Sequence, residues 1–324
     1  MSRAVVVLTG ANGFLGKHIL HILLEHGYAV RALVRIGAKF NFKSHPNLQI
    51  FEGDVHDKTF LYEVFKHADY AVHAAAVTSQ SVSDYKCYHK VNVTYTMRLY
   101  EAAENAHIKR FIFISSANTI QPGTYEKPGV EGKDANGWML KSNYIRSKAE
   151  AEKALKLRSG SCPFIILNPA FIIGPNEAGT GSGIILKRIR QSRIQFVPAG
   201  GKSFVYVEDV AMAVMAAFNR GNSGQNYLLS AYTFSFIDFY KACSQLMHKK
   251  LIIIVLPRFL LRSIAYIGDF LVKIGVNASF TSVNVKILNN ENVYDGTKVC
   301  VDLGLIYTDF RTVLFKSLLK NRKR

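Results

Sequence analysis

Residues 4–16 read AVVVLTGANGFLG, and this stretch decides the fold. The apolar run predicts a strand, and three glycines follow before a helical pattern begins. Gly10 permits a tight turn, Gly13 lets the backbone approach a pyrophosphate, and Gly16 lets the helix pack closely on the strand. The free N–H groups at the helix N-terminus would face the phosphates. The stretch predicts a dinucleotide-binding loop, with a purely structural turn as the alternative. The candidate cofactor-binding residues in it are Thr9, Gly10, Asn12, Gly13, Phe14, Leu15 and Gly16.

Outward from this loop, apolar strand patterns alternate with amphipathic helical patterns through the first two-thirds of the chain. Gly27 is predicted to end the first helix in the left-handed conformation. Strands that alternate with helices imply a parallel sheet covered on both faces. We therefore expect an α/β fold with a doubly wound Rossmann sheet. Its predicted strands are Ala4–Leu8, Ala29–Val34, Gln49–Phe51, Tyr70–His73, Phe111–Ile114 and Phe164–Leu167.

The alternating pattern loosens after Gly174, where glycines cluster and shorter elements follow. Tyr227–Leu229 is a further predicted strand. We expect residues 1–175 to form the dinucleotide-binding Rossmann domain, which also carries the catalytic residues. Residues 176–324 are expected to form mainly a smaller substrate-binding lobe, with segments that return to the Rossmann sheet. No repeat and no long linker separates the two parts.

The end of the second predicted strand bears on the choice of cofactor. It reads Leu33-Val34-Arg35, where proteins that prefer NAD usually place an acid for the ribose 2′-hydroxyl. No acid follows, and Arg35 is placed to pair with a 2′-phosphate, with Arg31 or Lys39 adding to the field. We expect NADP(H), with NAD(H) as the alternative if Arg35 is only one surface arginine among many.

A tyrosine and a lysine four residues apart, Tyr144 and Lys148, open a helical pattern that continues to Leu157. Residues four apart share a helix face, so both side chains can reach one substrate. Tyrosine has an unperturbed pKa near 10, and a neighbouring lysine cation is expected to lower it. The pair suits proton transfer to or from a hydroxyl or carbonyl. Taken alone, the same spacing is also typical of a solvated helix face.

The glycine loop and this pair together resemble the extended short-chain dehydrogenase/reductases. Further motifs follow in that family's order, and the resemblance covers residues 4–211 before it fades. Within the family, the chain looks nearest to the dihydroflavonol-reductase-like and 3β-hydroxysteroid-dehydrogenase-like branches. The motifs are Gly53-Asp54-Val55, His73-Ala74-Ala75-Ala76, Val91-Asn92-Val93, Phe111–Ser116, Asn168-Pro169 through Gly174-Pro175, and Phe204–Ala211.

The resemblance implies roles for individual residues. Ser116 would hydrogen-bond the developing oxyanion, Tyr144 would donate the proton, and Lys148 would bind the nicotinamide ribose. Asp54 is expected beside the adenine ring, and Asn92 is expected to be structural. Besides the glycine loop and Arg35, the implied cofactor-binding residues are Asp54, Val55, Ala74, Ala75, Tyr144, Lys148 and Pro169.

Three departures from the family pattern stand out. Asn168 stands where arginine is usual, which puts a substrate or loop contact in doubt. Tyr95 stands where glycine often follows the Val91-Asn92-Val93 segment. Thr119-Ile120-Gln121 replaces the common V-Y-G, which makes a nucleotide-sugar epimerase less favoured. None of these positions belongs to the catalytic set.

These patterns lead to one expected function and two alternatives. We expect an NADP(H)-dependent oxidoreductase that interconverts a carbonyl and an alcohol on a relatively apolar small molecule. The first alternative is a nucleotide-sugar epimerase or dehydratase with tightly bound NAD. The second is a non-catalytic dinucleotide-binding regulator, although such proteins tend to lose the tyrosine and lysine that this chain retains.

Composition narrows the partners and the compartment. The formal net charge of +18 attracts polyanions, but charge alone does not indicate nucleic-acid binding, and we expect none. Four dispersed cysteines without metal spacing indicate reduced thiols in a cytoplasmic protein and no metal site. The first apolar run is too short for a signal peptide. We expect most of Leu251–Ile274 to be a core helix pair, with a greasy pocket or peripheral membrane contact as alternatives. A homodimer is a further expectation from the family.

Overall fold

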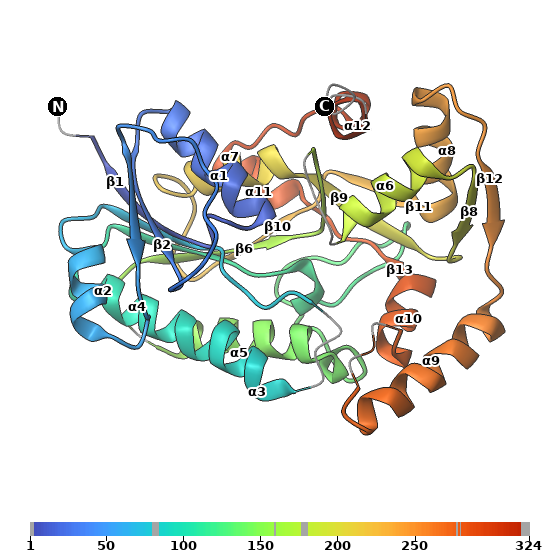
Figure 1. Ribbon diagram of the computed structural model, residues 1–324, viewed down its shortest axis with the longest axis horizontal. Coiled ribbons are helices and arrows are strands. Elements are labelled where there is room, and N and C mark those ends of the chain that lie inside the picture. The colour runs from blue at the N-terminus through green and yellow to red at the C-terminus, as the bar shows by residue number, and fades with distance from the viewer. Residues whose placement is uncertain are drawn as a thin grey trace.

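The computed structural model describes residues 3–79, 84–158, 160–175, 181–276, 278 and 280–318. Its centre is a seven-stranded sheet in the order β3-β2-β1-β4-β5-β6-β10, in which every neighbouring pair is parallel (Figure 1). All six strands predicted for the Rossmann sheet are confirmed, each within two residues of its expected ends. The strands are β1 (Val5–Thr9), β2 (Ala29–Val34), β3 (Leu48–Glu52), β4 (Tyr70–His73), β5 (Arg110–Ile114), β6 (Phe164–Pro169) and β10 (Asn226–Leu229).

Helices cover both faces of this sheet, which confirms the doubly wound arrangement (Figure 1). Alternate residues of β1 serve the two layers: Val6 and Leu8 join the core on one face, while Val7 joins the core on the other. The first face is covered by α1 (Phe14–Glu25), α7 (Val207–Ala216) and α11 (Thr297–Leu303). The second is covered by α2 (Lys58–Phe65), α4 (Tyr95–Asn105) and α5 (Asn143–Leu157).

The end of α1 follows the prediction made for it. Gly27 has a φ of +81°, and its N–H donates to the carbonyl of Leu24. The N–H of Tyr28 donates to the carbonyl of Leu23, which completes a left-handed cap. The chain can therefore turn at once into β2.

The second lobe is built on a smaller sheet and a two-stranded ribbon. In the smaller sheet β11, β9 and β13 are neighbours and β7 also pairs with β9, while β12 pairs with β8 in the ribbon. A separate apolar core lies here, around Phe204, Phe236 and Phe239. The elements are β7 (Phe171–Ile173), α6 (Ser182–Gln191), β8 (Ile194–Val197), β9 (Gly201–Tyr206), β11 (Tyr232–Ser235), α8 (Phe236–Leu246), β12 (Ile252–Val255), α9 (Arg258–Lys273), α10 (Ser282–Asn289), β13 (Glu291–Asn292) and α12 (Phe310–Leu318).

The chain passes between the lobe and the main sheet more than once. The predicted strand Tyr227–Leu229 is present as β10, which pairs with β6 at the edge of the main sheet. Helices α7 and α11, which also come late in the chain, pack on a face of that sheet. The lobe is thus attached at the carboxyl-end side of the sheet, where parallel α/β sheets bind ligands.

The expectation for Leu251–Ile274 is wrong for most of that segment. It forms β12 and α9 rather than a core helix pair, and in α9 only Leu261, Ala265 and Gly268 are buried. The remaining apolar side chains of α9 are partly or largely exposed, because the helix touches the rest of the lobe along one narrow side. Among the residues described, no helix combines the length and apolarity needed to cross a membrane.

Candidate functional site

The glycine loop has the geometry that its sequence predicts. Gly10 has a φ of +76°, and a Cβ on it would lie 2.6 Å from the backbone N of Ala75. A Cβ on Gly16 would lie 1.9 Å from the carbonyl O of Gly10, so the helix packs directly on the turn. Gly13, by contrast, faces open space apart from the Gly10 carbonyl, and no side chain caps the helix that it begins. The loop therefore presents free N–H groups at an open helix N-terminus.

A buried hydrogen-bond chain joins this loop to β4. The N–H of Ala75 donates to Thr9 Oγ1 over 3.3 Å, and Thr9 Oγ1 lies 2.7 Å from Nδ1 of His73. His73 Nε2 lies 3.0 Å from Thr96 Oγ1, whose own proton goes to the carbonyl of Asn92. Burial lowers the pKa of His73 to about 3, with Lys148 as a smaller cause, so the ring is neutral. The network then assigns the proton to Nε2, and Nδ1 accepts from Thr9. The structure thus places Ala74 and Ala75 against the glycine loop.

Asn92 extends this connection to the helix that carries the tyrosine and lysine. It lies in a π-helical turn, His89–Thr94, between α3 (Tyr85–Tyr88) and α4, and is fully buried. Its amide pairs with both backbone groups of Val77 and donates to Ser147 Oγ at 2.9 Å, while Ser147 donates to the carbonyl of Tyr144. Asn92 therefore has the structural role expected of it, because its hydrogen bonds connect the loop after β4 to α5.

The three expected catalytic residues lie together where β5 ends. Ser116 follows that strand and is buried, with its Oγ accepting from the N–H of Asn118. Tyr144 and Lys148 face it from the first turns of α5, and Tyr144 is hydrogen-bonded to Ser116. The Lys148 ammonium donates to the carbonyl of Ile114 at 2.7 Å and lies 4.5 Å above the Phe113 ring. The end of β5 and the first turns of α5 thus bring Ser116, Tyr144 and Lys148 together.

The pKa values of this pair differ from the expectation. Burial raises the pKa of Tyr144, its hydrogen bond with Ser116 opposes the rise, and Glu152 adds to it. The expected lowering by Lys148 is wrong for this form of the protein, because burial also lowers the pKa of Lys148, to about 7. A buried lysine that gives up its proton so readily exerts little field on its neighbour.

Glu152 is a buried group that sequence reasoning missed. It lies one turn beyond Lys148 on the same face of α5 and raises the pKa of that lysine against the effect of burial. Four neutral side chains donate to its carboxylate: Ser115 and Thr119 to Oε1, and the amides of Asn168 and Asn226 to Oε1 and Oε2 respectively. Its position four residues after Lys148, together with polar residues at the ends of three strands, was the signal that could have revealed it.

Asn168, one of the departures from the family pattern, belongs to this cluster. It is fully buried, and its amide N donates to Glu152 at 2.8 Å and to the carbonyl of Ser116 at 3.1 Å. The amide of Asn226 on β10 reaches both Glu152 and Asn168. Asn168 therefore fixes the turn that carries Ser116 and makes no contact toward the open side of the site among the residues described.

The contacts around the loop after β2 differ in two ways from those expected for the cofactor's ribose: Arg31 is not free to contribute, and an acid lies close by. Arg31 donates to the carbonyls of Val64 and Lys66 at the end of α2, so its guanidinium is occupied by the protein. An acid does lie nearby: Glu52, at the end of β3, pairs in register with Val34 and accepts from the N–H of Gly37 at 2.6 Å. Glu52 comes from the neighbouring strand, so the residues that directly follow Val34 gave no sign of this acid. Arg35 itself is exposed, and its side chain has no protein partner within the described part of the chain.

The other predicted cofactor residues surround the same sheet edge. Asp54 is exposed in the turn after β3, where its carboxylate accepts from the N–H of His56, and Val55 beside it is buried. Pro169 ends β6 and is buried beside β10. Phe14 reaches the loop beyond β7, since a Cβ on Gly174 would lie 3.2 Å from its ring.

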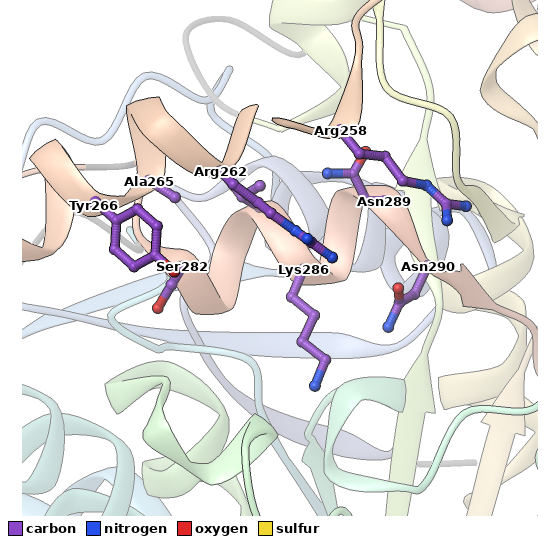
Figure 2. A pocket seen from close by; sticks show the side chains of 9 residues that line it. Arg258, Arg262, Ala265, Tyr266, Ser282, Lys286, Asn289 and Asn290 are labelled. Carbon is purple, nitrogen blue, oxygen red and sulfur yellow. The ribbon is translucent and has the colours of Figure 1, made fainter. Parts of the chain in front are cut away.

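Tyr144 packs in an apolar cluster to which both the Rossmann domain and the lobe contribute. Met139 and Ile145 pack with Ile287 of α10, and Trp138 and Val283 lie beside them. Two adjoining cavities, of about 330 and 500 Å³, share Arg258, Asn289 and Asn290 in their linings. Neither lining contains the catalytic set, although the larger cavity reaches Gln121 and Met139, which lie between Ser116 and Tyr144 in the sequence. In the smaller one, Arg258, Arg262 and Lys286 bring three cations to the space between α9 and α10 (Figure 2).

Comparison with known proteins identifies the family. The NAD dependent epimerase/dehydratase family matches residues 6–230, and the chain belongs to that family. It is 27% identical to a putative dihydroflavonol 4-reductase of Synechocystis sp., over 95% of this chain and 91% of that one. It is 28% identical to the 4-hydroxy-2-methyl-3-oxo-4-farnesyl-3,4-dihydroquinoline-1-oxide ketoreductase of Stigmatella aurantiaca, over 69% of this chain and 67% of that one. The crystal structure of UDP-glucose 4-epimerase from Thermus thermophilus in complex with NAD is similar in fold, with a TM-score of 0.74, 19% identity and 97% of each chain covered.

The residues present fit the nicotinamide dinucleotide of that family. The uncapped N-terminus of α1 and the open space at Gly13 would hold its pyrophosphate. The end of β4 and the turn at Ala74 and Ala75 border the same loop. Bound there, the cofactor would supply or accept a hydride.

The low pKa of Lys148 predicts how stability depends on pH. Its folded-state pKa of about 7 lies below the ordinary value, so between pH 7 and pH 10 the unfolded chain binds more protons at this site. The free energy of unfolding of the cofactor-free protein should therefore rise with pH in this window, by at most about 1.4 kcal/mol per pH unit from this group. Lys148→Met should remove that part of the slope, as measured by urea unfolding at several pH values. Equal slopes for the two proteins would show that Lys148 is not buried in this way.

Proposed function

We propose that this protein is an NADP(H)-dependent oxidoreductase that interconverts a carbonyl and an alcohol on a relatively apolar substrate. The observation that carries the proposal is the meeting of Ser116, Tyr144 and Lys148 at the end of β5, on the sheet edge that also holds the glycine loop. The two relatives whose names state a reductase activity support the reaction class.

The chain's own residues would act as follows in the direction of reduction. The hydroxyl of Tyr144 donates its proton to the substrate oxygen, and Ser116 donates a hydrogen bond to the same oxygen as charge develops there. The raised pKa of Tyr144 keeps it protonated and ready to donate at neutral pH. Lys148, one turn further along α5, supplies positive charge beside the phenol once its ammonium is stabilised. Oxidation of an alcohol runs the same steps in reverse.

An apolar substrate suits the surroundings of the tyrosine. Met139, Trp138, Val283 and Ile287 form the cluster in which Tyr144 packs. Burying apolar substrate surface against such side chains contributes about 25 cal/mol for each Å² removed from water. The same closure excludes water from the proton-donating group.

One observation favours the alternative of a nucleotide-sugar epimerase or dehydratase with tightly bound NAD. Arg258, Arg262 and Lys286 line the smaller cavity (Figure 2), and guanidinium and ammonium groups suit a diphosphate. Such a protein would keep its NAD through the reaction cycle and would consume none of it. The regulator alternative has no comparable support, because Ser116, Tyr144 and Lys148 are retained and lie together.

Nucleotide titration of two matched variants tests the cofactor assignment. We expect the wild-type protein to bind NADPH more tightly than NADH, and Arg35→Ala to weaken NADPH binding about 10- to 100-fold with little change for NADH. Glu52→Gln, on the neighbouring strand, should leave the preference for NADPH in place. Nicotinamide fluorescence follows each titration. A wild-type preference for NADH that Glu52→Gln abolishes would assign the ribose contact to Glu52 and overturn the NADP(H) assignment.

A further inference from the structure

Helix α9 carries an apolar face that nothing in the described part of the chain covers. Leu260, Ile264, Ile267 and Ile274 follow helical spacing along one side, and Phe259 and Phe270 lie beside them. Phe259 is 73% exposed, Ile267 62% and Phe270 61%. We call these six residues the α9 face. Large apolar side chains that are exposed together are rare on ordinary protein surfaces, and they usually mark an interaction surface.

The opposite side of the helix explains why this face points outward. Leu261, Ala265 and Gly268 are the buried residues of α9, and they face α10. A Cβ on Gly268 would lie 1.9 Å from the carbonyl O of Phe280, so the helix is held close along this narrow side. Figure 1 shows α9 at the outer edge of the lobe, with α10 between it and the rest of the molecule. The α9 face is therefore directed away from the protein core.

The ribbon that precedes α9 continues the exposed apolar surface. Ile252 and Ile254 on β12 are exposed, and they pair in register with the exposed Ile194 and Phe196 on β8. Only two residues separate β12 from α9. Along the chain, the apolar surface thus extends from the ribbon through the length of the helix.

The charges in this region indicate what covers the surface. Residues 245–286 contain six lysines and arginines and a single acid, Asp269, whose carboxylate accepts from the N–H of Ser282. Arg258, Arg262 and Lys273 lie on α9 itself, and the first two line the cavity between α9 and α10 (Figure 2). Such a surface attracts an anionic partner, whereas a second copy of this basic chain would be repelled. Nucleic acid would leave the apolar side chains uncovered.

We propose that the α9 face docks this protein onto an anionic membrane surface. The helix has sixteen residues and is about 24 Å long, too short to cross a bilayer, so it lies in the interface. Its apolar side chains enter the boundary between headgroups and acyl chains, while the exposed Lys273 in its last turn pairs with anionic headgroups. The site around Tyr144 is separate from this surface, so docking leaves the catalytic residues unobstructed.

Flotation of the full-length protein with lipid vesicles tests the proposal. We expect the wild-type protein to float with phosphatidylcholine vesicles that contain about 30% phosphatidylserine, and to bind pure phosphatidylcholine much less. Binding should weaken as salt is raised from about 0.1 M to about 1 M. Replacing Lys273 with glutamine should lower binding to the anionic vesicles about fivefold.

A matched pair of double variants separates the α9 face from net charge. Ile267→Asp with Phe270→Asp should lower binding to the anionic vesicles by at least about tenfold. Val301→Asp with Ile306→Asp makes the same change in charge at side chains that are 76% and 89% exposed on another part of the molecule, and should bind nearly as the wild type does. Unchanged affinity for the nicotinamide nucleotide verifies the fold of both variants.

Three outcomes would overturn the proposal. The wild-type protein could remain unbound with anionic vesicles, as expected if an acidic protein covers this surface. An equal loss of vesicle binding in both double variants would show that net charge, and not the α9 face, determines binding. Light scattering that shows a wild-type dimer, dissociated only by the α9 double variant, together with absence of flotation, would assign the face to a second copy of the chain.

Discussion

Replacing Tyr144 with phenylalanine should lower kcat for carbonyl reduction about 10²- to 10⁴-fold, the usual effect of losing a general acid. The phenyl ring keeps the packing against Met139 and Ile287, so the fold and the cofactor loop should be unaffected. The substitution removes the hydroxyl that is hydrogen-bonded to Ser116 and that we propose as the proton donor. Steady-state kinetics and nucleotide titration measure the two properties separately.

The control for this variant is Tyr62→Phe, which removes a hydroxyl from an exposed tyrosine on α2. It should change neither kcat nor nucleotide affinity. If Tyr144→Phe instead retained wild-type kcat, Tyr144 would not be the proton donor and the proposed roles in the catalytic set would be wrong. A loss of nucleotide affinity alone would make Tyr144 a binding residue only.

The second large effect is expected at Gly10. Alanine there would have to adopt a φ of +76° and would bring its Cβ within 2.6 Å of the Ala75 backbone. Positive φ costs about 1–2 kcal/mol for a residue with a Cβ, and overpacking against backbone costs about 1–3 kcal/mol. We expect Gly10→Ala to lower the free energy of unfolding by about 2–5 kcal/mol, and to abolish tight nucleotide binding because the loop must shift. Urea unfolding and nucleotide titration test both statements.

Gly27→Ala is the matched control for this variant. Gly27 also has a positive φ, of +81°, but nothing lies within 4 Å of a Cβ placed on it. Gly27→Ala should therefore lower the free energy of unfolding by only about 1–2 kcal/mol, the cost of a positive φ, and should leave nucleotide binding intact. Equal destabilisation by the two substitutions would show that the contact between Gly10 and the turn after β4 is not tight.

The main sheet could be predicted because local sequence determines it. The strands around Val6, Val30 and Ile112 are short apolar runs between helical patterns, and each occurs where expected. The glycine loop and the Tyr144–Lys148 pair are also local: a turn type and a helix spacing define them. Their meeting at one sheet edge follows from the rule that parallel strands end on the same side.

What sequence reasoning missed depends on contacts between distant segments. Glu52 reaches the loop after β2 from the neighbouring strand, and Glu152 meets Asn168 and Asn226 only once β6 and β10 pair. The pKa of Lys148 follows from its depth of burial, which spacing along a helix does not reveal. The apolar residues of α9 have a helical period that fits a core helix and a surface helix equally well, so only the position of α10 decides between them.

The measurement that tests the central claim most directly follows both nucleotide and substrate in one reaction. Purified protein is incubated with NADPH and a panel of aromatic and alicyclic ketones, and nucleotide and product are quantified together. The account predicts that NADPH is consumed in a one-to-one ratio with alcohol formed, and that Tyr144→Phe stops both. Protein that carries tightly bound NAD and converts a nucleotide sugar with no net change in the nucleotide would contradict it and establish the epimerase alternative.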